Sequence, residues 1–159
     1  MDTAGVRTAT IADLATVLRH RHAMFADMGC PEPSLAAMDE QALPYFARAF
    51  EDATYHHWFI DADDKVVAGA GVSVNPFYPG PRDPRPQRAW IVNVYTEPDY
   101  RKRGMAARLV KTVINWCRQN GIRVVYLHAS DSGLPLYRRL GFVSSNEMRL
   151  ELVSPPEVM

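Results

Sequence analysis

Three consecutive cations stand directly before a glycine in the stretch RKRG, which comprises Arg101, Lys102, Arg103 and Gly104. The apolar residues that follow recur at helical spacing and predict a helix from Gly104 to about Asn120. The first turn of a helix has backbone N–H groups without intrahelical partners, and a glycine lets an anion approach them. The stretch is therefore typical of a phosphate-binding loop, although a solvated basic turn has the same composition.

The composition of the chain restricts where such an anion site can act. The 159 residues fit one domain, and the 18 Lys and Arg residues balance the 18 Asp and Glu residues. Proteins that coat nucleic acid or an anionic membrane usually carry a surplus of cations. The sequence also lacks the motifs G-x-x-x-x-G-K-S/T and G-x-G-x-x-G. We therefore expect a local anion site, with neither nucleic acid nor a membrane as partner.

The elements that would position this loop follow from apolar spacing and from Gly and Pro. Thr10 and Asp13 resemble a capping box that opens the first helix, and Pro44 is expected to divide the second helical region into two short helices. Asp63 and Asp64 are expected to form the tight turn of a hairpin. The expected helices lie at residues 10–28, 34–52, 104–120 and 132–140. The expected strands lie at residues 6–9, 55–61, 65–74, 89–96, 123–129 and 147–153, with a proline-rich loop at 75–87.

The order of these elements predicts one α/β domain over residues 1–159. From residue 89 onward the order is strand, helix, strand, helix, strand, which predicts a right-handed crossover between parallel strands. The N-terminal strands are expected to be joined by a hairpin instead. We expect a mixed sheet with helices on both of its faces.

Two stretches resemble the GNAT family of N-acetyltransferases. The run VNVYTEPDYRKRGMAARLVKTVINW contains the family signature R/Q-x-x-G-x-G/A at residues 101–106, and LYRRLGF at residues 136–142 resembles the family's second motif. The resemblance covers residues 88–152 closely. It implies a mostly antiparallel, twisted sheet with a central parallel strand pair that splays apart, and it implies acetyl-CoA as cosubstrate.

Carried over position by position, the resemblance implies a cofactor site along one strand and the following helix. The backbone from Arg103 to Ala107 would hold the pyrophosphate, and Val94 and Tyr95 would lie along the pantetheine. Ser130 stands where the family often has Asn, and Gly133 stands where it has Ala. The implied cofactor-binding residues are Val94, Tyr95, Arg101, Lys102, Arg103, Gly104, Met105, Ala106, Ala107 and Ser130.

The resemblance also implies two catalytic candidates. Tyr137 matches a tyrosine near the cofactor sulfur and is a candidate general acid. Its spacing to Leu134 and Leu140 is equally that of a buried aromatic residue. Glu97 lies close to where the family often has a carboxylate that takes the amine proton directly or through water, but Glu97-Pro98-Asp99 also has the composition of a turn.

The acceptor pocket would be built from the first helix pair and from loops near the splayed strands. Phe25, Met28, Phe77 and Tyr78 are candidates there, although core packing is favoured for Phe25 and Met28. Asn93 is a polar residue on an otherwise apolar strand and is expected to point into the cleft, where it would bind substrate or water. The loop 75–87 is long enough to act as a lid.

The histidines do not predict a metal site. His56 and His57 alternate across a strand, and His20 and His22 lie two apart on a helix, so neither pair shares a face. We therefore expect catalysis without a metal.

These observations predict an N-acetyltransferase that moves an acetyl group from acetyl-CoA to a primary amine by direct attack in a ternary complex. A non-catalytic acyl-CoA-binding module is the alternative. The acceptor, a small molecule or a peptide amine, stays open, as does a homodimer formed through the C-terminal strand. Cys30 and Cys117 have no metal-like or disulfide-like spacing, and the N-terminus does not resemble a signal peptide, so a cytoplasmic location is expected.

Overall fold

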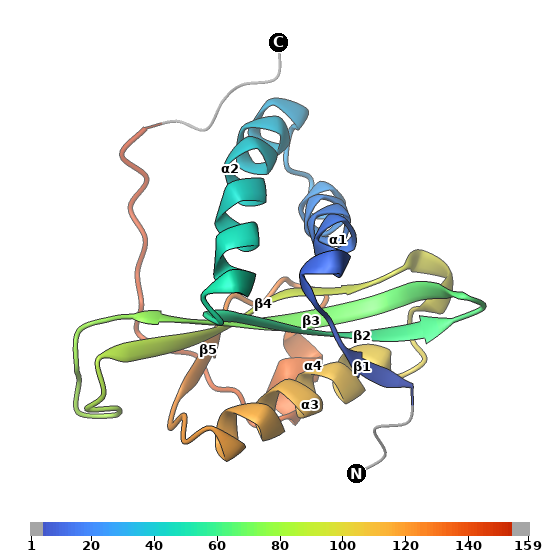
Figure 1. Cartoon of the computed structure of the whole chain (residues 1–159). Helices are drawn as coiled ribbons and strands as arrows, with labels where there is room; N and C mark the ends of the chain where they lie inside the picture. Colours follow the sequence, from blue (N-terminus) through green and yellow to red (C-terminus); the bar gives the residue numbers. More distant parts are fainter. Residues whose placement is uncertain (1–4, 154–159) are drawn as a thin grey trace.

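In the computed structural model, which describes residues 5–153, a five-stranded sheet lies between two layers of helices (Figure 1). The strands are β1 (Val6–Thr8), β2 (Tyr55–Ala62), β3 (Lys65–Pro76), β4 (Gln87–Thr96) and β5 (Val125–Leu127). The helices are α1 (Leu14–Asp27), α2 (Glu32–Glu51), α3 (Met105–Gln119) and α4 (Leu134–Arg139), with short 3-10 turns η1 (Ile11–Asp13) and η2 (Pro98–Tyr100). α1 and α2 stand on one face of the sheet, and α3 and α4 lie on the other.

The sheet has the strand order β1-β2-β3-β4-β5. β1 to β4 pair in antiparallel fashion, whereas β4 and β5 are parallel, as the element order predicts. This confirms the mixed α/β fold class. The parallel pair lies at the end of the described sheet rather than at its centre, because residues 147–153 do not form the expected last strand.

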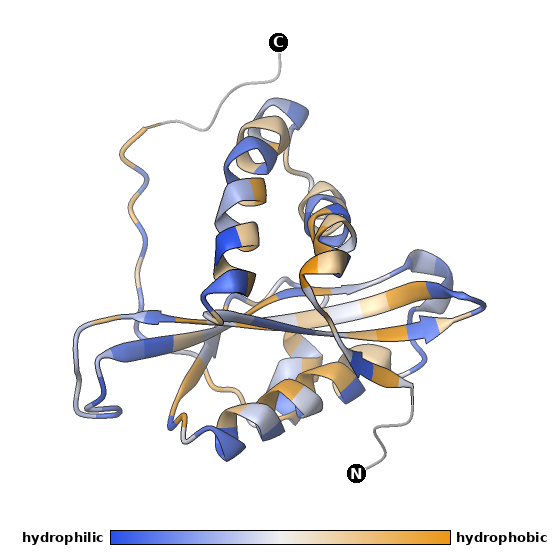
Figure 2. Cartoon of the chain, viewed as in Figure 1, coloured by the Kyte–Doolittle hydropathy of each residue, from blue (hydrophilic) through white to orange (hydrophobic). Residues whose placement is uncertain are grey.

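Each face of the sheet has its own apolar core. The apolar side of α3, which includes Leu109, Val110 and Val113, is buried against the face of the sheet that α3 and α4 cover. On the other face Val17 of α1 and Phe46 of α2 pack over β2 and β3. Figure 2 shows the hydrophobic residues along the strands between the two helical layers. The sheet is therefore covered on both sides, which holds β4 and the start of α3 in fixed positions.

The turn signals in the sequence are confirmed. Thr10 and Asp13 form both hydrogen bonds of a capping box, with Thr10 N donating to Asp13 Oδ2 at 2.9 Å. Asp63 and Asp64 both have positive φ, at 52° and 60°, as a two-residue hairpin turn of the mirror-image type requires. The strands of the next hairpin are longer than expected and its loop is shorter. β3 extends to Pro76 and β4 begins at Gln87, which leaves 77–86 as the loop.

The expectation of two short helices between residues 34 and 52 is wrong. α2 is a single helix of 20 residues that contains Pro44 and has Pro31 as its N-cap. Pro44 lies on an exposed face of the helix. Water can therefore bind the carbonyl group that loses its N–H partner, and the apolar contacts of the opposite face keep the helix continuous.

The expected strand at residues 147–153 is also not formed. The segment leaves the sheet and runs past it as an extended tail (Figure 1), with Met148 94% exposed, Leu150 82% exposed and Leu152 88% exposed. The alternation of apolar and charged residues is typical of a half-buried strand, but β5 is only three residues long and pairs with β4 alone. A strand pattern without a sufficient partner stays extended.

Candidate active site

β4 has an edge without a strand partner in its second half. Its parallel pairing with β5 ends where Ile91 lies opposite Leu127, so from Val92 to Thr96 only β3 pairs with β4 within the described residues. The two parallel strands thus separate, as the family resemblance implies. Backbone groups on such an edge can bind an extended ligand in the way that an added strand does.

A bulge in β4 lies beside this edge and turns Asn93 toward the face of α1. The β3–β4 register shifts between Gly69 and Gly71, and Asn93 opposite them has a φ of 59°. Val92 packs in the core under α1 and α2, whereas Val94 packs in the core with α3. The extra residue therefore places Val92 and Asn93 on the same face and shifts the alternation of the strand by one.

The loop before α3 presents free backbone donors. Gly104 is the N-cap of α3 with a φ of 80°, and a Cβ atom there would meet nothing within 4 Å. The first helical bond of α3 is Arg108 N to Gly104 O at 3.1 Å, and within the described residues the N–H groups of 103–107 bind no acceptor. Such donors, with the positive end of the helix dipole, are suited to bind a phosphate or pyrophosphate group.

The three cations of this loop differ in their surroundings. Arg101 is held by the protein, since its Nε donates to the Thr96 carbonyl at 2.9 Å and its Nη2 donates to Asp27 Oδ2 at 2.7 Å. Arg103 lies over the ring of Tyr100 at 5.1 Å, and both Lys102 and Arg103 are exposed. Arg101 thus fixes the loop to α1, while Lys102 and Arg103 leave their charges at the rim.

Tyr137 is buried on the α3 side of the sheet, where burial raises the pKa of its hydroxyl. Gly133 makes room for the ring, because a Cβ atom there would lie 2.9 Å from Tyr137 Cε2. Ser130 Oγ accepts the Gly133 N–H at 3.1 Å and so closes the turn before α4. Ser130 and Gly133, the two departures from the family pattern, therefore together position the ring of Tyr137.

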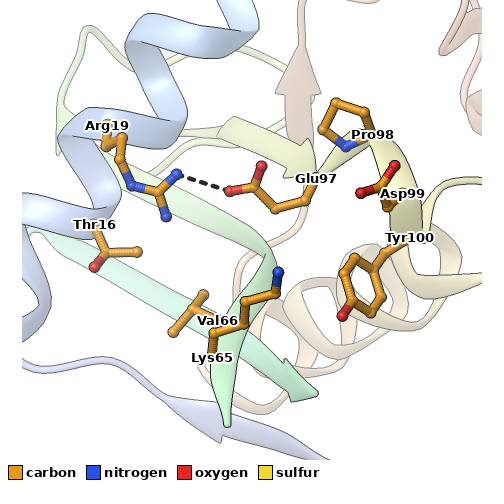
Figure 3. Close-up of a pocket in the computed structure, with 8 residues that line it drawn as sticks. All are labelled: Thr16, Arg19, Lys65, Val66, Glu97, Pro98, Asp99 and Tyr100. Carbon is orange, nitrogen blue, oxygen red and sulfur yellow. Dashed lines mark hydrogen bonds and ion pairs between the residues drawn. The ribbon is translucent and has the colours of Figure 1, made fainter. Parts of the chain in front are cut away.

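Glu97 lies on the opposite side of the sheet from Tyr137 and faces α1. Its Oε1 accepts a hydrogen bond from Arg19 Nη1 at 2.8 Å and lies 3.5 Å from His20 Nε2. Figure 3 shows Arg19 and Glu97 pointing toward one another at a cavity of about 430 Å³. The cavity is lined by Thr16, Arg19, Lys65, Val66, Glu97, Pro98, Asp99 and Tyr100. No described contact joins Glu97 to Tyr137.

Asn93 begins a chain of buried, hydrogen-bonded polar side chains that includes Tyr55 and His57. Asn93 is 1% exposed, and its Oδ1 accepts from Arg21 Nη1 at 2.7 Å while its Nδ2 donates to the Tyr55 hydroxyl at 2.8 Å. The Tyr55 hydroxyl lies 2.6 Å from His57 Nδ1. Burial lowers the pKa of His57 to about 3, so the neutral ring accepts this bond at Nδ1. Asn93 thus has protein partners rather than an open face.

Two glycines of β3 accommodate this chain. A Cβ atom on Gly71 would collide with the Tyr55 hydroxyl, and one on Gly69 would lie 2.6 Å from His57 Nε2. The signal in the sequence that could have located these hydrogen-bonded side chains is the pattern of large residues on β2 opposite glycines on β3. Arg21 belongs to the same chain of contacts, since its guanidinium is half-buried against Asn93 rather than turned to water.

His20 is a second residue that the sequence analysis did not assign to the site. The side chain is fully buried, and its ring lies 5.0 Å from that of Tyr95. Burial is the main cause that lowers the pKa of His20 to about 4, so the ring is neutral near pH 7. Apolar spacing on α1 could not indicate this burial, because His20 does not belong to the apolar stripe.

The acceptor candidates fall into two groups that the structure does not bring together. Phe25 lies under the Arg21 guanidinium at 5.0 Å, and Met28 at the end of α1 is 49% exposed. Phe77 stacks on Arg88 at 3.9 Å, and Tyr78 is 75% exposed in the β3–β4 loop. Phe25 therefore lies beside Arg21, which bonds to Asn93, whereas Phe77 contacts Arg88 at the start of β4.

His56 and His57 point to opposite faces of β2, as their alternation along the strand predicts. His56 stacks on Trp116 of α3 at 4.4 Å, whereas His57 bonds to Tyr55 on the other face. Over residues 5–153 no group of three or more His, Cys, Asp or Glu side chains is arranged to hold a metal ion. In the same range no helix is both long and apolar enough to cross a membrane.

Comparison with known proteins identifies the class that this fold and site define. Residues 21–142 match the acetyltransferase (GNAT) family, which is more than half of the chain. The chain therefore belongs to the GNAT family, and the fold and the recognised motifs are those of that family. A comparison with curated proteins gave no match.

Solved structures agree with this assignment. A GCN5-related N-acetyltransferase from Ralstonia eutropha JMP134 is 32% identical with a TM-score of 0.88, over 92% of this chain and 97% of that one. A predicted acetyltransferase from Clostridium acetobutylicum, solved with acetyl-CoA, is 26% identical with a TM-score of 0.84, over 93% of this chain and 94% of that one. The aminoglycoside N-acetyltransferase AAC(6')-Iy, solved with CoA, shares the fold at 17% identity and a TM-score of 0.69, over 92% and 91% of the two chains.

Proposed function

We propose that this protein is an N-acetyltransferase that transfers the acetyl group of acetyl-CoA to a primary amine by direct attack in a ternary complex. The observation that supports this most is the combination of free N–H groups at 103–107 with the unpaired edge of β4. The first suits the pyrophosphate of acetyl-CoA and the second suits its extended pantetheine arm. The family membership and the relative solved with acetyl-CoA support the same cosubstrate.

The reaction requires an acid, a base and stabilisation of an oxyanion. The amine nitrogen forms a bond to the thioester carbon, the carbon–sulfur bond breaks, and the amine loses one proton. In our proposal Tyr137 donates its hydroxyl proton to the departing sulfur, a role supported by the burial that raises its pKa and keeps it protonated. A backbone N–H near Tyr95 stabilises the oxyanion. Glu97 takes the amine proton, directly or through water, with Arg19 fixing its orientation.

Calorimetric titration with acetyl-CoA tests the cofactor site. Gly104→Glu places a bulky anion where the pyrophosphate is expected, so it should abolish the micromolar binding that we expect for the wild type. Gly29→Glu is the matched control, because Gly29 has a φ of 86° and a Cβ there also meets nothing within 4 Å. It carries the same backbone strain but lies outside the loop. Equal binding by both variants would contradict the proposed site.

Turnover of an amine panel then tests catalysis. Tyr137→Phe removes the proposed acid without changing the shape of the ring, and should lower kcat by about 100-fold or more. Its affinity for acetyl-CoA should stay within about twofold of the wild type. If the wild type binds acetyl-CoA but acetylates no amine, the non-catalytic acyl-CoA-binding module replaces the enzyme as our conclusion.

We further propose a cytoplasmic location, which is supported by the two free cysteines, Cys30 and the buried Cys117. The exposed apolar residues of the C-terminal tail support a homodimer formed through that segment, as an extended strand pattern can pair with another chain. Sedimentation across a range of protein concentrations tests the dimer, and a monomer at every concentration would contradict it.

A further inference from the structure

Arg21 is a half-buried cation whose charge no carboxylate neutralises within the described residues. Its guanidinium lies 5.0 Å from the ring centre of Phe25 and 5.4 Å from that of Phe46, and its Nη1 donates to Asn93 Oδ1 at 2.7 Å. Its Nε is buried without an acceptor. Its Nη2 makes no hydrogen bond to any described residue and is not among the buried atoms. The side chain is therefore fixed by the protein but keeps donors to spare.

Neighbouring arginines on this side of the molecule are paired with carboxylates. Arg19 binds Glu97 at 2.8 Å, and Arg101 binds Asp27 at 2.7 Å. Asp39 is the carboxylate that acts on Arg21 through space, and it bonds instead to His22 Nδ1 at 2.7 Å. Burial is the main cause that lowers the pKa of Arg21, which reflects a charge held away from water without a counter-ion. Such a charge is unfavourable until an anion reaches it.

The position of Arg21 links it to the reaction centre. Asn93, its hydrogen-bond partner, directly precedes Val94 in β4, and both lie beside the edge that β5 leaves unpaired. In the proposed enzyme this edge holds the cosubstrate. An anion that binds the Arg21 guanidinium would therefore lie on the α1 side of the strand that carries the thioester, which is the side of Phe25 and Glu97.

We propose that Arg21 binds an anionic group of the acceptor, so that the substrates are small primary amines that also carry a carboxylate or a phosphate. Amino acids and amino-sugar phosphates have this chemistry. A guanidinium with free N–H donors suits both groups because it can form two parallel hydrogen bonds to them. Polyamines and aminoglycosides would instead bring further positive charge to a cation that is already unpaired. This inference rests on the proposed N-acetyltransferase function.

Matched pairs of acceptors test the inference. The wild type is assayed with an amino acid and its carboxamide, with glucosamine 6-phosphate and glucosamine, and with spermidine as a polycation. We expect kcat/KM to be about 100-fold higher for the anionic member of at least one pair, mainly through a lower KM. The pair that shows the preference tells a carboxylate acceptor from a phosphate acceptor.

Variants then assign the preference to Arg21. Arg21→Met should reduce the ratio between the two members of a pair to about one, and Arg21→Lys should keep part of it because the charge remains. Arg48→Met, on an exposed part of α2, is the matched control and should keep the wild-type ratio. The melting temperature and the acetyl-CoA affinity of each variant separate a loss of folding or of cofactor binding from a change in acceptor preference.

The outcomes are separable from a failure of the proposed function. Equal rates for charged and neutral members, or a preference for spermidine, would overturn the role of Arg21 while the enzyme stands. An unchanged ratio in Arg21→Met would do the same. If Arg21→Met does not fold, the wild-type ratios and Arg21→Lys decide. If no amine is acetylated, or acetyl-CoA does not bind, the proposed function falls and this inference falls with it.

Discussion

Replacing Asn93 by alanine should cost this protein much of its stability. Asn93 accepts a bond from the Arg21 guanidinium, donates one to the Tyr55 hydroxyl and has a left-handed backbone. Losing the bond to a charged donor costs about 2 kcal/mol, and losing the neutral bond costs about 1 kcal/mol. The left-handed backbone adds about 1 kcal/mol for alanine, which tolerates it less well than asparagine. We therefore expect a loss of about 4 kcal/mol in the free energy of unfolding.

Urea denaturation followed by circular dichroism measures this loss. With a slope of about 2 kcal/mol per molar urea, the midpoint should fall by about 2 M. Asn93→Gly separates the contribution of the backbone conformation from that of the side chain. It removes the same two hydrogen bonds, but glycine adopts the left-handed conformation without strain, so this variant should be more stable than Asn93→Ala by about 1 kcal/mol. Asn75→Ala is the control. It removes a bond of 2.6 Å to Ser73 Oγ and a long, exposed bond of 3.3 Å to the Tyr45 hydroxyl in an ordinary strand, and it should cost about 1 kcal/mol.

Two results would refute this reasoning. A loss below about 1.5 kcal/mol in Asn93→Ala would mean that water or a neighbouring side chain replaces both bonds. Equal stabilities of the alanine and glycine variants would mean that the left-handed conformation at residue 93 does not contribute, and the bulge would then have another cause.

Three further predictions concern other parts of the molecule. Burial lowers the pKa of His20 to about 4 and that of His57 to about 3, so below pH ~6.5 the unfolded chain binds protons that the folded chain does not. The free energy of unfolding should therefore be full above that pH and should fall toward pH 5, by up to about 1.4 kcal/mol per pH unit for each histidine. A urea midpoint that does not change between pH 7 and pH 5 would contradict this. Gly133→Ala should displace the Tyr137 ring and lower kcat about tenfold with acetyl-CoA affinity retained, whereas wild-type kinetics would show that the ring can shift without loss. Leu150→Glu should change the unfolding free energy of the dilute monomer by less than about 0.5 kcal/mol, because Leu150 is 82% exposed within one chain and would pack only in the proposed dimer; a loss near 2 kcal/mol in the monomer would reveal a packed strand.

The parts of the fold that the sequence predicted depend on neighbouring residues. The capping box of Thr10 and the Asp63-Asp64 turn each involve residues at most three apart, so their signals lie within a short window. The same holds for the apolar stripe of α3 and for Gly104 before it. The loop before α3, with its free N–H groups, could therefore be located from the sequence alone.

The parts that the sequence did not predict depend on distant partners. Arg21 and Asn93 are 72 residues apart, and Tyr55 and Asn93 are 38 apart, so no local pattern reveals that they share hydrogen bonds. The continuity of α2 depends on which side of the helix Pro44 faces. The missing last strand depends on the shortness of β5, and alternation shows only that a segment could form a strand.

The fit of Tyr55 against Gly71 also limits the order in which this sequence can change. A single methyl group on Gly71 would collide with the Tyr55 hydroxyl, and it would also lie 2.5 Å from Tyr55 Cζ and 2.8 Å from His57 Nδ1. Tyr55→Phe removes only the nearest of these atoms, so a larger residue 71 also requires smaller or displaced side chains at residues 55 and 57. Substitutions at these three positions should therefore be strongly non-additive, and any lineage or selection experiment that enlarges residue 71 must first change the side chains that pack against it.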